Sequence, residues 1–196
     1  MPAEPRPIHE HAIENLRIIR ETMERAGSFT SIPGWGGVIV GLTAIAACVL
    51  AQRFVTLPHT WIRVWLGEAI LAAVIAAITM GLKWRRTSTP FMSGAAKRFF
   101  VSYFAPVIAG AALTFTLAKR GSFDPLPATW LLLYGTAFVS SGAFSVRLIP
   151  VMGVCYMLLG GLAALVRLPA GNLFLGVGFG GLHIIFGFLI ARRYGG

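Results

Sequence analysis

Residues 61–82 read WIRVWLGEAILAAVIAAITMGL, an apolar run whose only charged side chains are Arg63 and Glu68. A helix of about twenty residues is long enough to cross the roughly 30 Å hydrocarbon core of a bilayer. Stretches of similar length and character recur at 35–54, 99–117, 127–146, 150–166 and 172–191. The sequence therefore predicts an all-α integral membrane protein with six transmembrane helices.

The composition supports a membrane protein rather than a soluble or nucleic-acid-binding one. Hydrophobic residues make up 56% of the 196-residue chain and charged residues 12%, whereas about a quarter of the residues in soluble domains are charged. The net charge is +10, but basic residues gather beside the apolar stretches, where they meet anionic lipid head groups. The residues that we expect at the head groups are Lys83, Arg85, Arg86, Lys97 and Arg98. We expect no nucleic-acid partner.

The distribution of Lys and Arg predicts the orientation. Of the 17 Lys and Arg residues, twelve fall on the side of the N-terminus and five on the other side. The first group is Arg6, Arg17, Arg20, Arg25, Lys83, Arg85, Arg86, Lys97, Arg98, Arg147, Arg192 and Arg193, and the second is Arg53, Arg63, Lys119, Arg120 and Arg167. Because cytoplasmic loops carry the excess of basic residues, we expect both termini in the cytoplasm.

Residues 1–27 form a separate N-terminal segment, with an extended proline-rich part followed by an amphipathic helix over 8–26. The apolar residues of the helix follow a 4-3-4-3 spacing, at Ala12, Leu16, Ile19, Met23 and Ala26, which is typical of a coiled-coil seam. Glu14 and Arg17 stand at pairing distance on a helix. Since acidic residues balance the basic ones here, packing against a second copy, a partner or the bundle is favoured over a helix lying on the membrane surface.

Three short motifs suggest an internal repeat within the six-helix bundle at 28–196. They are LPHTW at 57–61, LPATW at 126–130 and LPAGN at 168–172. Proline is tolerated in the first turn of a helix, so each motif can begin a span on the same side of the membrane. We expect three helical hairpins, at about 33–86, 97–147 and 149–193. A chance similarity of turn chemistry is the alternative.

Glycine and proline within the spans predict close packing and a kink. Gly37 and Gly41, like Gly176 and Gly180, are spaced four residues apart, which lets helices approach closely in lipid, either within one chain or between chains. Pro106 lies inside the third span, where it should kink the helix or open its backbone locally.

Glu68 and His183 are ionisable residues inside predicted spans, where they are costly and indicate function by default. Glu68 fits a protonatable or cation-binding carboxylate in a cavity, or a structural ion pair with Arg63 or Arg167. His183 fits a proton relay or an axial ligand for haem or a chlorin, or an imidazole bonded to a neighbouring helix. Ser140 and Ser141 belong to the same candidate polar site, although hydroxyls in spans are more often contacts between helices.

The sequence contains no motif for a known catalytic or metal centre. HExxH, CxxC, the phosphate-binding GxxxxGK[ST] and a nucleophile elbow are all missing. Cys48 and Cys155 lie within apolar spans and are expected to be small buried side chains without a disulfide or metal. We therefore predict no enzyme activity and no cofactor, with haem or chlorin on His183 as the alternative.

Two segments, FTSIPGWGGVIVGLTAIAA at 29–47 and GGLHIIFGFLIARRYGG at 180–196, resemble small uncharacterised six-span bacterial membrane proteins, some of them encoded near a winged-helix regulator. The resemblance implies an inner-membrane protein that senses or responds to membrane conditions. It implies no activity and no functional residues.

The leading hypothesis is a non-enzymatic membrane protein that works as a homo-oligomer or as an accessory or structural subunit of a larger assembly. A small transporter or channel is the second hypothesis, with Glu68 and His183 lining a common path. A haem- or pigment-binding subunit that uses His183 is the third.

Overall fold

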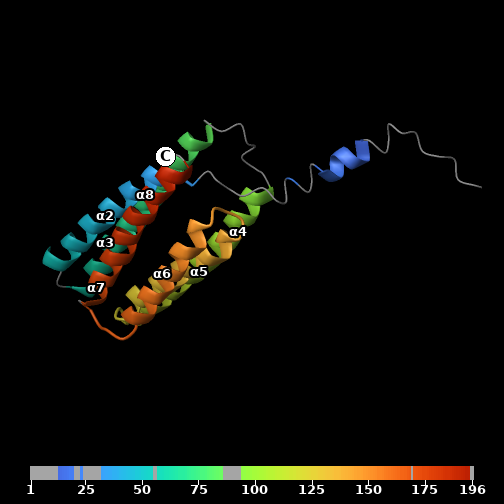
Figure 1. Ribbon diagram of the computed structural model, residues 1–196. Helices are drawn as coiled ribbons and strands as arrows, with labels where there is room; N and C mark the ends of the chain where they lie inside the picture. The colour runs from blue at the N-terminus through green and yellow to red at the C-terminus, as the bar shows by residue number, and fades with distance from the viewer. Residues whose placement is uncertain are drawn as a thin grey trace, which may run out of the picture.

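The computed structural model describes residues 13–19, 23, 32–54, 57–85, 94–168 and 170–194. Long helices account for most of them (Figure 1). They are α2 (Gly34–Phe54), α3 (Pro58–Arg85), α4 (Gly94–Lys119), α5 (Leu126–Gly142) and α6 (Leu148–Ala163), followed by a continuous C-terminal rod made of α7 (Ala170–Leu175), the π-helix η1 (Gly176–Leu182) and α8 (His183–Tyr194).

Four of these helices are long and apolar enough to cross a membrane: α2, α3, α4 and the C-terminal rod. The mean hydropathy of their most apolar windows lies between 1.7 and 2.2. The all-α membrane character that the sequence predicts is therefore confirmed for these helices.

The fourth and fifth predicted spans, at 127–146 and 150–166, form shorter helices. Helix α5 has 17 residues and α6 has 16. The chain between them folds into tight turns, in which the amide of Phe144 donates to the carbonyl of Ser141 and the amide of Ser145 to that of Gly142. Because these turns satisfy carbonyls at the end of α5, the helix stops at Gly142 instead of continuing to residue 146.

The helices run alternately up and down and fall into two groups (Figure 1). In one group α2 packs against α3 and against the C-terminal rod, and in the other α5 packs against α4 and α6. Within the ranges of the first two predicted hairpins, 33–86 and 97–147, α2 packs on α3 and α4 packs on α5. Within the third range, 149–193, α6 packs mainly on α5 and the rod mainly on α2, so the arrangement in three hairpins stays a prediction. The C-terminal rod crosses to the first group because its glycines match those of α2.

The contact between α2 and the C-terminal rod is nearly backbone against backbone. A Cβ added at Gly41 would lie 2.6 Å from the carbonyl oxygen of Gly180, and one added at Gly37 would lie 3.3 Å from the Cα of Gly187. A Cβ at Gly176 would lie 2.6 Å from Sγ of Cys48. All four glycines predicted for helix packing therefore lie in this contact within one chain, with Gly41 against Gly180, Gly37 against Gly187 and Gly176 against Cys48.

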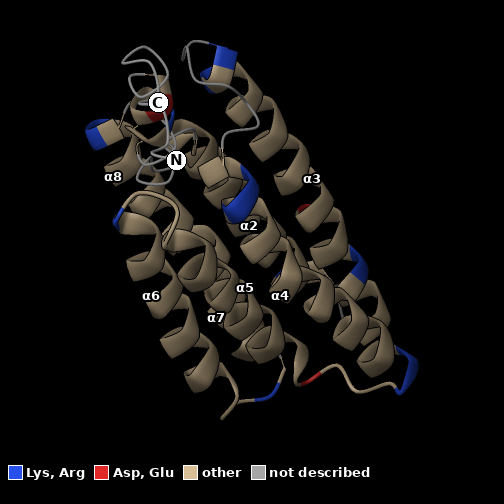
Figure 2. Cartoon of the chain, turned by 90° about the vertical axis from the view of Figure 1, so that its right-hand side faces the viewer, with Lys and Arg blue, Asp and Glu red and all other residues tan. Residues whose placement is uncertain are grey.

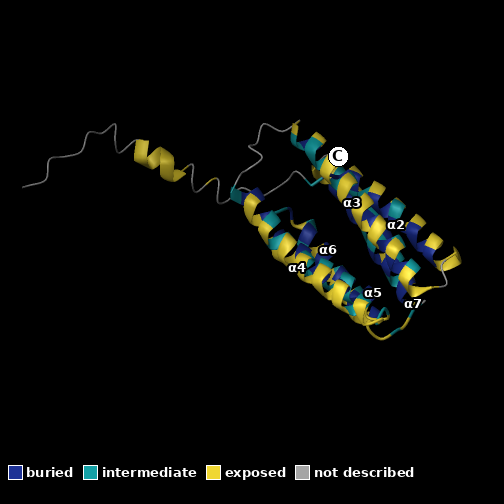
Figure 3. Cartoon of the chain, turned by 180° about the vertical axis from the view of Figure 1, so that it is seen from behind, coloured by how far each residue is buried: buried dark blue, intermediate teal, exposed yellow. Residues whose placement is uncertain are grey.

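The core takes buried side chains from all the long helices, and its fully buried leucines Leu126, Leu131 and Leu175 come from α5 and the C-terminal rod. The outward faces of α3 and α4 carry rows of exposed residues (Figure 3). Most of these exposed residues are apolar, including Ile70, Val74, Ile108 and Phe115. An exposed apolar surface of this kind suits lipid or other membrane helices.

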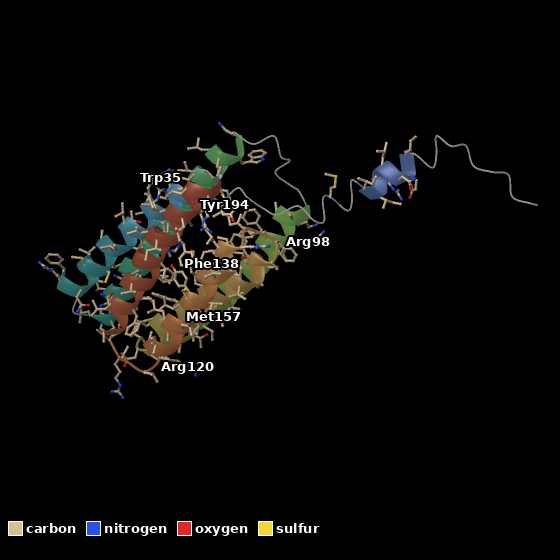
Figure 4. All side chains as sticks on the ribbon, viewed as in Figure 1. Trp35, Arg98, Arg120, Phe138, Met157 and Tyr194 are labelled. Atoms are coloured by element: carbon tan, nitrogen blue, oxygen red, sulfur yellow. The ribbon has the colours of Figure 1, made fainter. Side chains whose placement is uncertain are left out.

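Basic residues gather toward the two ends of the helices, whose middle parts are almost free of charge (Figure 2). Arg98, Trp35 and Tyr194 lie toward one end of the bundle and Arg120 lies at the other (Figure 4). Arg85, Lys97 and Arg98 are exposed, as expected for residues at the head groups. Arg86 lies outside the described residues.

Lys83 differs from the other predicted head-group residues because it is buried. Its Nζ donates to the carbonyl oxygens of Ile32 at 3.0 Å and Tyr194 at 3.1 Å. The side chain therefore ties the end of α3 to the chain entering α2 and to the end of α8. The prediction of a head-group contact is corrected here: two carbonyls at helix ends supply the acceptors that an ammonium group needs.

Within the N-terminal segment, residues 13–19 are helical, and Leu16, Ile19 and Met23 are exposed. The expected pair of Glu14 and Arg17 forms, with 2.9 Å between oxygen and nitrogen. Ala12 and Ala26, the outer positions of the predicted seam, lie outside the described residues.

We expect Gly41→Ala to destabilise the protein, because the new methyl group would enter the backbone of the C-terminal rod. Overpacking of this kind costs about 1–3 kcal/mol. Gly81→Ala is the matched control, since nothing lies within 4 Å of a Cβ at that position. It should be neutral or stabilise the helix by about 0.5–1 kcal/mol. Unfolding of the purified variants in detergent measures both, and equal effects would contradict the close contact.

Candidate functional site

The buried polar side chains of the described helices are distributed among several separate hydrogen-bond networks. Apart from Lys83, they are Glu68, Thr114, Ser141, Asn172 and His183. Within the described part of the chain, every buried side-chain nitrogen or oxygen has a hydrogen-bond partner. This satisfaction is expected of groups in hydrocarbon, where water is not available as a substitute partner.

His183 lies at the centre of the first network, between α5, α6 and the C-terminal rod. Its Nε2 is 3.0 Å from the hydroxyl of Tyr134, and its Nδ1 is 2.7 Å from the hydroxyl of Tyr156. Nδ1 also lies 3.0 Å from the carbonyl oxygen of Phe179. Phe138 and Phe179 complete an aromatic shell, with ring centroids 6.4 and 6.3 Å from the imidazole. Phe138 lies in the middle of the bundle (Figure 4).

Counting protons in this network assigns the tautomer of His183. The carbonyl of Phe179 can only accept, so Nδ1 must carry a proton. Tyr156 donates its own proton to the carbonyl of Gly178 at 2.8 Å, which leaves its oxygen to accept from Nδ1. Nε2 then accepts from Tyr134. In a neutral imidazole, Nδ1 has one proton for two acceptors, the carbonyl of Phe179 and the oxygen of Tyr156, and Nε2 accepts from Tyr134. Both ring nitrogens therefore have partners within the chain.

The π-helix η1 lies directly before His183 and carries two of these acceptors, the carbonyls of Gly178 and Phe179. π-helical turns are rare and occur frequently at functional sites. Glycine fills much of this segment because a Cβ would meet neighbouring side chains. At Gly178, for example, it would lie 2.5 Å from Cδ2 of Leu131.

Asn172 lies at the centre of a second network, near the beginning of the C-terminal rod. Its Oδ1 accepts from the indole nitrogens of Trp61 at 3.0 Å and Trp65 at 2.9 Å. Its Nδ2 donates to the carbonyl of Cys48 at 3.1 Å and to Oε1 of Gln52 at 2.9 Å. One amide group thus joins α2, α3 and α7. In the sequence, Asn172 belongs to the third LP motif and was not predicted as a site residue. A polar amide at the start of an apolar span was the feature that could have indicated its role.

The first two LP motifs meet in space through their tryptophans. Trp61 of α3 stacks on Trp130 of α5, with ring centroids 5.5 Å apart and planes at 3°. Trp130 in turn donates to the hydroxyl of Thr114 on α4 at 2.8 Å. The stack joins the two groups of helices at the end of the bundle where these motifs begin their helices.

Glu68 lies in a third place, between α2 and α3. It is 9% exposed, and its Oε1 is 2.8 Å from the hydroxyl of Thr43. The ion pair considered with Arg63 or Arg167 is not formed, since the one ion pair among the described residues joins Glu14 and Arg17. No hydrogen bond joins the Glu68 contact to the His183 network.

Ser140 and Ser141, which were predicted to share a polar site with Glu68 and His183, lie apart from both. Ser141 is buried and donates to the carbonyl of Ala137 in its own helix at 2.7 Å. The hydroxyl of Ser140 lies 3.0 Å from the carbonyl of Ser102 on α4 and 3.2 Å from the carbonyl of Ala137 in its own helix, so the contact with α4 is the shorter one. The four candidate polar residues therefore do not form one site.

Ser140 compensates for Pro106. α4 runs through Pro106 as a single helix, so the expected opening of the backbone is not seen. In an α-helix the carbonyl of residue 102 accepts from the amide of residue 106, and proline has no amide hydrogen. The hydroxyl of Ser140 supplies the missing donor from the neighbouring helix. The contact ties α4 to α5.

No group of three or more His, Cys, Asp or Glu residues that could hold a metal ion occurs in the described ranges. Cys48 and Cys155 are free thiols. A haem on His183 would have to replace the hydrogen bond between Nε2 and Tyr134.

No protein-family model, curated protein or solved structure matches this chain.

A double-mutant cycle tests the contact between Ser140 and Pro106. Ser140→Ala leaves the carbonyl of Ser102 without a donor, which should cost about 1 kcal/mol of unfolding free energy. Pro106→Ala restores the backbone donor, so Ser140→Ala should cost clearly less in that background. Unfolding in detergent gives the coupling energy, and additive effects would show that the serine does not serve this carbonyl.

Asn172→Ala should destabilise the protein more than removal of a hydroxyl that bonds only to its own helix. It leaves the indole donors of Trp61 and Trp65 buried without their acceptor, at about 1–3 kcal/mol. Thr136→Ala is the control, because Thr136 donates only to the carbonyl of Leu132 in the same helix. Unfolding in detergent compares them, and a loss no greater than that of Thr136→Ala would contradict the central role of Asn172.

Proposed function

We propose that this chain is a six-span bacterial inner-membrane protein with cytoplasmic termini, which acts without catalysis as an oligomer or as an accessory subunit of a membrane assembly. A role in sensing membrane conditions fits the same proposal. Its expected surroundings are anionic head groups, a second copy of the chain or other membrane subunits.

The separation of Glu68 and His183 is the observation that carries the proposal. A transport path through both would place them along one polar passage. Instead, Glu68 contacts Thr43 between α2 and α3, whereas His183 is enclosed by Tyr134 and Tyr156. Satisfied, separate polar contacts favour a packed interior over a pathway. The same enclosure of His183 argues against the use of its imidazole for a pigment.

Six crossings are supported by the up-and-down course of the chain. Helices α5 and α6 are about 25 Å long at 1.5 Å per residue, and a bilayer can thin locally around a short span at modest cost. They pack along each other and carry the core of the bundle. The exposed Arg85, Lys97 and Arg98 near one end supply positive charge for anionic head groups.

Assembly is supported by the N-terminal segment. Leu16, Ile19 and Met23 are 66%, 53% and 69% exposed, and their spacing matches a coiled-coil seam. Since isolated short helices are marginal in water, such a seam requires a packing partner to be stable. A second copy of the chain provides the same seam with matching register.

Mass measurement of the full-length protein in nanodiscs tests the proposal. We expect a mass above that of one 21.0 kDa chain, reduced by Ile19→Glu, which places a charge in the seam. Ile18→Glu is the matched control, because Ile18 is equally exposed at 51% but lies outside the 4-3-4-3 positions.

A monomeric mass for the unmodified protein, with no other subunit retained after gentle purification from its native membrane, would overturn the assembly proposal. An equal effect of Ile18→Glu and Ile19→Glu would show that the seam is not the contact.

A further inference from the structure

Glu68 is set in apolar surroundings at the contact of α2 and α3. On its own helix, the positions one turn away are Val64, Trp65, Leu71 and Ala72. The facing part of α2 carries Thr43 among buried residues such as Ala44 and Ala47. A carboxylate in such a place is costly unless a positive charge or several donors accompany it.

Among the described residues, no ion pair brings a positive charge to Glu68. On α3, Arg63 is exposed and Lys83 bonds to the carbonyls of Ile32 and Tyr194. On α2 and the rod, the charged residues Arg53, Arg192 and Arg193 are exposed in the last turns of their helices. Cys48 of α2 and His183 of the rod have hydrogen-bond partners of their own, namely Asn172 and two tyrosines. The hydroxyl of Thr43 is the polar partner that Glu68 has.

The hydroxyl of Thr43 has too few protons to serve an ionised Glu68. Its Oγ1 lies 2.8 Å from Oε1 of Glu68, 2.9 Å from the carbonyl oxygen of Val40 and 3.3 Å from that of Ile39. A hydroxyl has one proton and two lone pairs, and a carbonyl oxygen can only accept. Threonine in a helix commonly donates to a carbonyl of the preceding turn. When Thr43 donates its proton to the carbonyl of Val40, the hydrogen bond between Thr43 and Glu68 needs a proton from the carboxyl group of Glu68.

We propose that Glu68 is a proton-binding site: in the folded protein it is a neutral carboxylic acid at neutral pH, which donates to Thr43 across the contact of α2 and α3. Protonation then completes both hydrogen bonds of the hydroxyl. Loss of the proton would place a negative charge in the apolar contact between α2 and α3. The hydroxyl of Thr43 would then have one proton for two close oxygens, Oε1 of Glu68 and the carbonyl oxygen of Val40. The packing of α3, whose main partner is α2, therefore depends on this proton. The inference does not rest on the proposed role in assembly.

Infrared spectroscopy of the full-length protein in nanodiscs tests this directly. A protonated carboxylic acid gives a carbonyl stretching band that is separate from the bands of carboxylates. We expect this band at neutral pH in the unmodified protein and its loss in Glu68→Gln. Asp124→Asn is the matched control, because Asp124 is exposed beyond the end of α4, and it should leave the band unchanged. Thr43→Val should shift the band, since it removes the acceptor.

Labelling with a hydrophobic carbodiimide gives a second measurement on the unmodified chain, which does not depend on the folding of a variant. The reagent adds to a protonated carboxyl in an apolar site, and all atoms of both partners remain in the rearranged N-acylurea. We expect a peptide adduct at Glu68 and none at Asp124. The proposal is overturned if the unmodified protein shows no protonated-acid band, if the band persists in Glu68→Gln, or if Glu68 stays unlabelled.

Discussion

The absence of water around membrane helices is the constraint on which the rest of this structure depends. Each polar group that enters the hydrocarbon must find its partner within the chain. The carbonyl that Pro106 leaves without an amide receives the hydroxyl of Ser140, and carbonyls of the π-helix receive Tyr156 and His183. In each case the compensating donor comes from a helix or turn that packing brings close. Helix packing therefore determines which donors reach the unpaired carbonyls, and these hydrogen bonds in turn stabilise the packing.

The C-terminal rod shows how this works across the whole bundle. Its glycines allow it to lie against the backbone of α2, which places it in the first group of helices. Asn172 then reaches α2 and α3, whereas His183, three turns further on, reaches α5 and α6. The rod therefore contributes one hydrogen-bonding side chain to each group of helices, Asn172 to the first and His183 to the second. The stack of Trp61 on Trp130 adds a second connection between the groups, directly between α3 and α5.

The sequence predicted the parts of this fold that depend on local composition. Apolar length predicted the four helices that are long enough to cross a membrane, and glycine spacing predicted close packing on the faces of α2 and the rod. The pairing of helices was less predictable, because α6 and the rod follow each other in sequence but pack mainly on other helices. Lys83 was misjudged for a related reason: its acceptors come from residues 32 and 194, which are distant in sequence. Hydrogen-bond partners depend on the register between helices, which a single sequence does not specify.

Proton counting separates the two ionisable residues that the sequence singled out. Each ring nitrogen of His183 has a donor or an acceptor within its network when the imidazole is neutral. Glu68 differs because its single hydroxyl partner also faces the carbonyl of Val40. Its contacts are complete only when the carboxyl group itself brings a proton. A change in protonation would therefore act first on the contact of α2 and α3, and would leave the enclosed network of His183 in place.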